Sequence, residues 1–469
     1  MITLLRPHLH NTLLLNTYLL FLVRILGTGF SFLFWALAAR TMPATEVGLA
    51  SGVASATMLL AGLAQLGLGY GLVRHLAHAD DPHGLLNLSV VMSGLAGLGL
   101  AALFLIGIPW WSPALLPVRT ALWPILLFIA LTLSTTWSQL LNWAFLATRH
   151  LTFSLVKNVS QVLLTIIFLF CLSPLLSGYS LAITALTLAT LLSLAWSFGS
   201  LLPGAQPGYK FRLPYQASKL LLSFMSFRSR RLRNPPISWV KVRSGGFLPS
   251  VEMTCLSSYA SKRFSFTRYS LLNYLTDQFQ RAPDTLLPLI VIHQFGPGPG
   301  GYFFVVWAIG RGIATWAGSI ADALFAEGAN EPTLAPVYAR RSMKLGLLLT
   351  GGLSLAMVLG GKFLLLIYGP DYAETGIELL YYLALAAMPS VLLSIFVNFL
   401  RLQDRLSLIF VVMLVNISCG ILFSYLGMLW FGFVGVGIGW LVSQIAVLGG
   451  AMSWWWKQSY QPWGMKNDS

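Results

Sequence analysis

Long apolar runs separated by polar gaps dominate this 469-residue sequence and restrict what it can fold into. A helix needs roughly 20 apolar residues to cross a hydrocarbon core of about 30 Å, and several runs reach that length. Hydrophobic residues make up 57% of the chain and charged residues 9%, which is too apolar a composition for a soluble protein of this size. The alternation expected of barrel strands is absent. The pattern predicts an all-α polytopic membrane protein.

The apolar runs predict about twelve transmembrane helices in two groups of six. The first run follows Arg6 and is too long for a cleaved signal sequence, whose apolar region has roughly 7–15 residues. The predicted spans are residues 12–38, 47–71, 86–110, 120–146, 151–173, 180–202, 268–293, 300–326, 343–367, 376–400, 406–428 and 432–453. The expected domains are an N-terminal six-helix bundle (1–202), a basic linker (203–267), a C-terminal six-helix bundle (268–456) and a tail (457–469). The linker is Ser-rich and lacks sustained periodicity, so we expect it to be poorly ordered.

Lys and Arg lie mainly in alternate gaps between the predicted helices. With a cytoplasmic N-terminus, the cytoplasmic gaps and tails hold twenty-three of them, Lys157 included, and the opposite gaps hold Arg40, Arg119 and Lys362. Without the linker the ratio is still eleven to three. The positive-inside rule therefore predicts that the linker and both termini are cytoplasmic.

The net charge of +15 follows from these flanking residues, which face anionic lipid headgroups, so we expect no nucleic-acid partner. The sequence contains no P-loop, GxGxxG or HExxH motif, and its three cysteines have no metal-site spacing. We therefore predict neither a cofactor nor a metal.

A second group of charged residues lies inside the apolar runs and marks a candidate site. An ionisable side chain at bilayer depth costs about 2.5–3.5 kcal/mol on insertion scales, so it usually faces a bundle interior or a watery cavity. Arg24, Arg281 and Arg311 each lie about ten to fourteen residues from a helix start, or roughly 15–20 Å, near the midplane. Three cations at one depth would suit an anionic group such as phosphate. Arg24 has no acidic residue on its own helix.

Asp277, Asp284 and Asp322 are alternative partners for two of these arginines. Asp277 and Asp284 flank Arg281 at four and three residues, on one face of the seventh predicted helix. Asp322 shares a face with Arg311 on the eighth. The three acids form either structural ion pairs or a proton or cation relay, and the sequence leaves both possibilities open.

Other polar or helix-breaking residues lie in the same spans. Gln65 and Gln139 occur in stripes of small and hydroxyl residues, which are more often packing seams than ligand contacts. Because a buried amide needs a partner, these two remain candidate cavity residues. Pro283 and Pro288 each remove a backbone hydrogen bond, which predicts a bend or hinge in the seventh helix.

Several segments also resemble a known transporter family. They are "NTYLLFLVRILGTGFSFLFWALAARTMPATEVGLAS", "LAQLGLGYGLVRHL", "YSLLNYLTDQFQRAPDTLLPLIVIHQFGPGPGGYFFVVWAI", "ADALFAEGANE" and "LLLIYGPDYAETGIELLYYLALAAMPSVLL". Their order and spacing resemble the Wzx-like oligosaccharide flippases of the multidrug/oligosaccharidyl-lipid/polysaccharide (MOP) exporter superfamily. The similarity covers most of the chain outside the linker, which is longer than the usual one and differs from it in composition.

The resemblance implies two six-helix bundles arranged as a V around a central cavity, as in MATE-like transporters. It implies a flippase of the bacterial inner membrane that moves polyprenyl-pyrophosphate-linked oligosaccharides by alternating access, for O-antigen, capsule or exopolysaccharide synthesis. Cationic cavity residues would then bind the pyrophosphate and glycan, a role that falls to Arg24, Arg281 and Arg311. The implied partners are the lipid-linked oligosaccharide and membrane lipids, with a polysaccharide polymerase and glycosyltransferases as further candidates.

Two other classes of protein also fit the sequence in part. A drug/cation antiporter or major-facilitator-type transporter suits twelve helices with a long middle loop. However, the gap "VRHLAHADDPHG" lacks the facilitator signature, and a cation exporter should favour acids over arginine. A membrane glycan polymerase or ligase would carry catalytic residues on a large outward loop, whereas the large loop here is predicted to be cytoplasmic. We therefore do not expect an enzyme.

Overall fold

The computed structural model describes residues 29, 31–76, 82–148, 151–200, 251–330, 335–403 and 405–459. Regular structure in these ranges consists of helices, without strands, which confirms the predicted all-α class. Predictions for residues 1–28, 203–250 and 460–469, Arg24 among them, lie outside the described residues.

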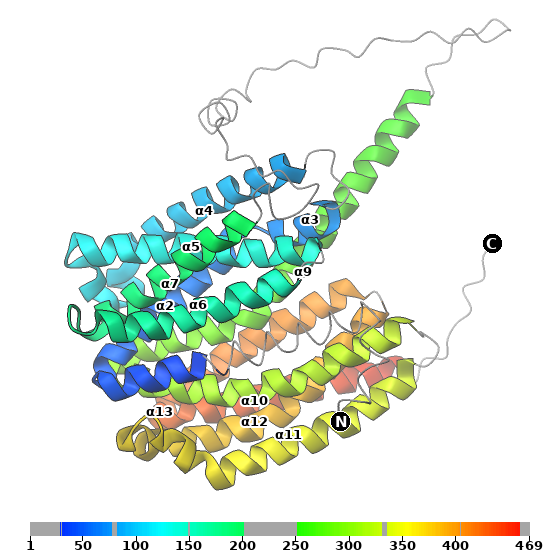
Figure 1. Ribbon diagram of the computed structural model, residues 1–469. Coiled ribbons are helices and arrows are strands. Elements are labelled where there is room, and N and C mark those ends of the chain that lie inside the picture. Colours follow the sequence, from blue (N-terminus) through cyan, green and yellow to red (C-terminus); the bar gives the residue numbers. More distant parts are fainter. Residues whose placement is uncertain are drawn as a thin grey trace, which may run out of the picture.

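The helices form two bundles packed side by side (Figure 1). The N-terminal bundle contains a helical segment at 31–41, α2 (Ala44–Ala64), α3 (Leu68–His75), α4 (Pro82–Trp111), the 3-10 helix η3 (Pro113–Arg119), α5 (Leu122–Ala147), α6 (Leu151–Leu172) and α7 (Gly178–Ser200). The C-terminal bundle contains α9 (Val251–Phe295), α10 (Pro297–Asn330), α11 (Ala335–Leu366), α12 (Pro370–Leu402) and α13 (Leu406–Ser459). These elements coincide with the predicted spans from 47–71 onward, whereas the first predicted span, 12–38, is described only at residue 29 and from residue 31.

Eight helices of the described chain are long and apolar enough to cross a membrane by length and composition. One of them, α13, is two helices joined at Gly432, whose φ of 63° reverses the chain. The two halves pack backbone to backbone, since a Cβ on Gly427 would lie 2.1 Å from the Gly435 carbonyl oxygen. Only glycine permits so close a helix contact, a known device of membrane helix pairs.

Helix α9 starts before the expected end of the linker and contains both of the helix-breaking prolines. Helix α9 begins at Val251, so residues 251–267 of the predicted linker are helical, because helix propagation from an established segment costs little. The same helix contains both Pro283 and Pro288, and the bend expected there stays a prediction. The unpredicted interruption is in the second span, where Leu66 (φ 49°) and Gly67 (φ 78°) separate α2 from α3.

Glycine contacts join the two bundles at the end of the molecule where α9 turns into α10, which we call the Gly296 end. A Cβ on Gly48 of α2 would lie 1.7 Å from the Pro297 carbonyl oxygen of α10. A Cβ on Gly301 would lie 2.4 Å from the carbonyl oxygen of Ala44. The backbones of α2 and α10 are therefore in direct contact, and any side chain at these positions would separate them.

The segment 31–41 reinforces this junction with hydrogen bonds to the turn between α11 and α12. Arg40 donates through Nε to the Ile367 carbonyl oxygen at 2.8 Å and through Nη2 to that of Leu366. The Tyr368 hydroxyl donates to the Phe32 carbonyl oxygen at 3.2 Å. Burial, with a smaller contribution from Tyr372, raises the pKa of Tyr368, so this hydroxyl keeps its proton and remains a donor.

The glycine contact predicts that Gly48→Ala destabilises the fold. The added methyl group must push α10 away from α2, and such overpacking costs about 1–3 kcal/mol of unfolding free energy. Gly352→Ala in α11 is the matched control, because a Cβ there meets nothing within 4 Å. It should be neutral or stabilise by up to roughly 1 kcal/mol through helix propensity. Denaturant unfolding in detergent micelles measures both, and equal effects would contradict the proposed backbone contact.

Candidate functional site

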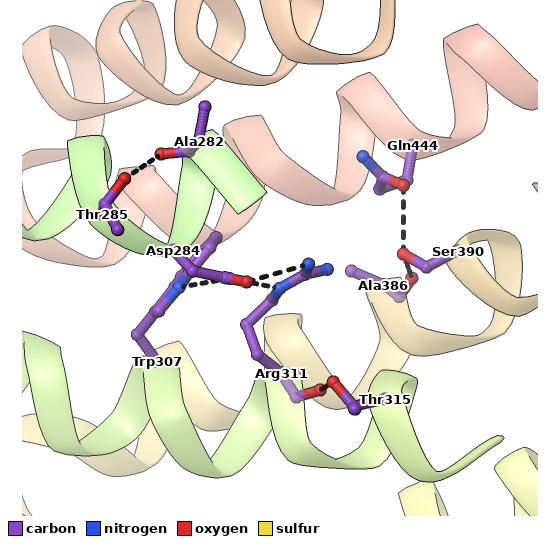
Figure 2. A network of polar contacts seen from close by, with 9 residues as sticks. All are labelled: Ala282, Asp284, Thr285, Trp307, Arg311, Thr315, Ala386, Ser390 and Gln444. Atoms are coloured by element: carbon purple, nitrogen blue, oxygen red, sulfur yellow. Dashed lines mark hydrogen bonds and ion pairs between the residues drawn. The ribbon is translucent and has the colours of Figure 1, made fainter. Parts of the chain in front are cut away.

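An ion pair between α9 and α10 forms the centre of the candidate site. Arg311 donates through Nε to Asp284 Oδ1 at 2.7 Å and through Nη2 to Oδ2 at 3.4 Å. The Trp307 indole donates to the same Oδ1 at 3.1 Å. Asp284 therefore accepts three hydrogen bonds from α10, as Figure 2 shows.

Two indole rings hold the Arg311 guanidinium on its other sides. Its Cζ lies 5.9 Å from the Trp307 ring centroid and 5.3 Å from that of Trp440 on α13. The two rings meet each other edge-to-face at 5.1 Å. A planar guanidinium can stack on such rings, which the compact ammonium group of a lysine cannot do.

A small polar pocket of about 150 Å³ opens beside Arg311 within the C-terminal bundle. Its polar lining comes from α9, α10, α12 and α13 and consists of Gln280, Arg311, Thr315, Ser390, Ser394, Asn398, Arg401, Asn416 and Gln444. Figure 2 shows Arg311 between Asp284 and the hydrogen-bonded pair Ser390 and Gln444. Two of the five N–H donors of Arg311 bind Asp284. The part of the chain that the structure describes contains no hydrogen-bond partner for the other three.

Arg401 is a second cation in this pocket, and the sequence interpretation placed it among the loop charges. Its Nη1 donates to Asn398 Oδ1 at 3.2 Å in the last turn of α12. The pocket lining follows α12 from Ser390 to Arg401, roughly 16 Å of helix, away from the Gly296 end. The spacing of Ser390, Ser394, Asn398 and Arg401 at i, i+4, i+8 and i+11 is the sequence signal that marks this face.

An apolar cavity of about 620 Å³ lies on the other side of Asp284, between the two bundles. The segment 29–35, Met58 of α2 and the helices α10 and α11 line it. Asp284 lines the apolar cavity, and its partner Arg311 lines the polar pocket. The ion pair therefore separates a mainly polar compartment from a mainly apolar one.

The predicted site residues of α9 and α10 form a different set of pairs from the expected one. Arg281 binds Asp277 at 3.1 Å on its own helix, and its side chain is 54% exposed. Asp284 binds Arg311 instead of Arg281, so the expected three-residue ladder does not form. Asp322 lies in α10, but its side chain is outside the described set, so its predicted pairing with Arg311 is not tested.

Gln65 and Gln139 contact each other across the N-terminal bundle. Gln65 Nε2 donates to Gln139 Oε1 at 2.9 Å, and Gln65 is only 6% exposed. Gln65 lies at the break between α2 and α3, where the Tyr274 hydroxyl of α9 donates to the Leu63 carbonyl oxygen at 2.9 Å. The amide pair and the tyrosine thus satisfy polar groups at a helix interruption, as membrane interiors require.

No cluster of three His, Cys, Asp or Glu side chains suited to a metal ion occurs among the described residues. The donors around Arg311 are a guanidinium, amides and hydroxyls, which bind anions and sugar hydroxyls more readily than cations.

Two family models match the chain, one in each half. The model described as "Polysaccharide biosynthesis protein" matches residues 13–224, and the MatE model matches residues 302–426. No curated protein sequence matched the chain.

Solved structures share the fold over nearly the whole chain at low sequence identity. An inward-facing multidrug resistance MATE family transporter of the MOP superfamily aligns with a TM-score of 0.65 and 13% identity, over 92% of this chain and 94% of the other. The lipid II flippase MurJ in an inward closed conformation aligns with a TM-score of 0.61 and 12% identity, over 94% and 87%. An outward-facing multidrug resistance MATE family transporter of the MOP superfamily aligns with a TM-score of 0.56 and 14% identity, over 94% of this chain and 95% of the other.

Two helical bundles around a cavity are the fold that this chain shares with solved MATE transporters and a lipid II flippase. The chain is similar to the polysaccharide biosynthesis family in its first half and to the MatE family in its second, which agrees with the resemblance to the MOP superfamily noted in the sequence.

The Gln65 and Gln139 contact predicts energetic coupling between these residues. Replacing either one by leucine leaves the other amide unpaired in the interior, which costs about 1–3 kcal/mol. Replacing both removes the mismatch, so the double variant should recover about 0.5–2 kcal/mol relative to the sum of the single costs. A double-mutant cycle of unfolding in micelles measures this coupling, and strictly additive costs would contradict the contact.

Proposed function

We propose that this protein is a flippase that moves polyprenyl-pyrophosphate-linked oligosaccharides across the bacterial inner membrane for cell-surface polysaccharide synthesis. The observation that carries the proposal is the Asp284 and Arg311 pair, which lies where a polar pocket meets an apolar cavity. A lipid-linked glycan has the same division, with a charged sugar-bearing head on an apolar chain.

The polar pocket supplies the chemistry that the head group requires. Arg311 has three remaining N–H donors and Arg401 adds a second positive charge, while Asp284 balances only one of the two. A pyrophosphate oxygen is a strong acceptor for such donors. The amides and hydroxyls of Gln444, Asn416 and their neighbours would bind sugar hydroxyls.

The apolar cavity would receive the first part of the polyprenyl chain, since it lies between the bundles and is lined by Phe304, Ile309, Met357 and similar residues. The matching model for polysaccharide biosynthesis proteins and the fold shared with a lipid II flippase support a lipid-linked glycan as substrate. The charge bias of the gaps supports cytoplasmic termini, so that the end opposite the Gly296 end, with Arg401, would face the cytoplasm. We propose no catalytic role for the chain.

Replacing Arg311 tests this proposal. In proteoliposomes carrying a nitrobenzoxadiazole-labelled undecaprenyl-pyrophosphoryl oligosaccharide, dithionite quenching reports the flipping rate. We expect Arg311→Ala to slow flipping roughly 10- to 100-fold, because two or more charge-assisted hydrogen bonds are lost. Arg311→Lys should retain part of the rate, since it keeps the charge but loses the planar fork.

Arg341→Ala is the matched control, because Arg341 is exposed on α11. We expect this variant to flip the labelled lipid at the wild-type rate. Arg24→Ala belongs in the same series, since its predicted cavity role rests on the sequence alone. Wild-type flipping by correctly folded Arg311→Ala protein would refute the assigned role.

A drug/cation antiporter is the second candidate, favoured by the MatE family model and the MATE folds. The pocket argues against it, because Arg311 and Arg401 repel organic cations. We expect no ethidium efflux from proteoliposomes that flip the labelled glycolipid. Efflux of ethidium without glycolipid flipping would replace the flippase proposal with the antiporter.

A further inference from the structure

Lys157 of α6 is completely buried inside the N-terminal bundle, with 0% of its surface exposed. The charge pattern counted it among residues that flank the membrane. The structure places it inside a helix, six residues after Leu151 and therefore about 9 Å into the bundle.

The Lys157 amine has only neutral partners in the described chain. Its Nζ lies 2.7 Å from both the carbonyl oxygen and the hydroxyl oxygen of Ser138 on α5. No carboxylate is available on the neighbouring helices, because residues 82–250 contain neither Asp nor Glu. Glu46 of α2 is at the Gly296 end, where its carboxylate accepts a 2.7 Å hydrogen bond from the Tyr179 backbone N–H.

The helices packed against α6 present no other charged group to Lys157. Helix α5 contains no ionisable side chain, and α7 contains only Tyr179, at its far end. On α6 itself, Cys171 lies in the last turn, away from Lys157. Arg149 and His150 precede α6 and lie outside the described residues.

Polar side chains extend from Lys157 in both directions along the α5, α6 and α7 interface. Toward the centre of the bundle, the Ser138 hydroxyl lies 3.4 Å from Gln161 Oε1, and Gln161 Nε2 donates to Thr190 Oγ1 at 3.0 Å. Toward the 149–150 connection, Ser154 donates to Asn142 Oδ1 at 2.9 Å. Lys157 thus lies between two groups of hydrogen-bonded polar side chains at this interface.

We propose that Lys157 is a proton-binding site that couples proton movement to transport. An ammonium ion that is fully buried beside only the neutral oxygens of Ser138 is poorly solvated, so the closed bundle favours the neutral amine. Opening α5 and α6 toward the 149–150 connection admits water, and the amine takes up one proton as R–NH₂ + H⁺ → R–NH₃⁺. Closing the bundle returns that proton to water. The coupling to transport rests on the proposed flippase function; the proton-binding site itself does not.

Spin-label distances test the proton site without any substrate. Val156 of α6 and Leu345 of α11 have exposed side chains, so both tolerate labels in a background with Cys171, Cys255 and Cys419 replaced by serine. In nanodiscs, lowering the pH should increase the population with a longer Val156 to Leu345 distance. Lys157→Met, neutral at every pH, should stay at the short distance, whereas Lys344→Met, an exposed matched control, should respond like wild type.

A Lys157→Met protein that keeps the wild-type pH response, or a wild-type protein with none, would overturn the proton site. Lys157→Gln serves as a second neutral variant if Lys157→Met does not fold. Lys157→Arg, charged at every pH, should stay at the long distance, and a short distance at low pH would also contradict the proposal.

Proteoliposomes with an imposed pH gradient test the coupling. Wild-type flipping of the labelled glycolipid should accelerate with the gradient, and Lys157→Met should lose that acceleration. An unchanged gradient response in Lys157→Met would overturn the coupling. A pH-dependent distance in wild type without any glycolipid flipping would instead refute the flippase proposal and leave the proton site standing.

Discussion

A charged or amide group inside these bundles is costly unless it has a partner within the protein, and this constraint organises the rest of the structure. In the C-terminal bundle the constraint is met by charge balance. Asp284 accepts from Trp307 and Arg311, and the guanidinium packs against Trp440. The pair fixes the register of α9 against α10 and holds Arg311 with unused donors facing the polar pocket. The same contacts therefore stabilise the bundle and prepare the site.

The N-terminal bundle meets the constraint differently, because residues 82–250 contain no acidic side chain. Its buried amides and hydroxyls bind one another, as Gln65 and Gln139 do, and its one fully buried lysine among the described residues binds only Ser138. A salt bridge is a permanent charge arrangement, whereas a lysine with neutral partners changes charge when water reaches it. In the proposed mechanism the C-terminal bundle binds the anion and the N-terminal bundle exchanges the proton.

The sequence predicted the helical segments from residue 47 onward, because length and hydropathy determine which segments can enter a membrane. It predicted the site less well, since helical periodicity relates only residues on the same helix. Asp284 shares a face with Arg281 but binds Arg311 on the next helix, and this depends on how α9 and α10 cross. Lys157 was misassigned because a charge six residues inside a helix resembles a flanking charge in a gap count. The break at Leu66 carries no proline signal and depends on Tyr274 and Gln139 from other helices.

The positions of the contacts along the helices suit a protein that opens at one end at a time. At the Gly296 end, Gly48 and Gly301 bring the backbones of α2 and α10 together, and Arg40 binds the turn between α11 and α12. The polar pocket extends from Ser390 toward the other end, and Lys157 is nearer to that end as well. Opening the Gly296 end requires separating the backbones of α2 and α10. No flexible side chain lies between them that could keep the contact while the helices move apart. Such an interface is either closed or open, which is the bistability that alternating access needs.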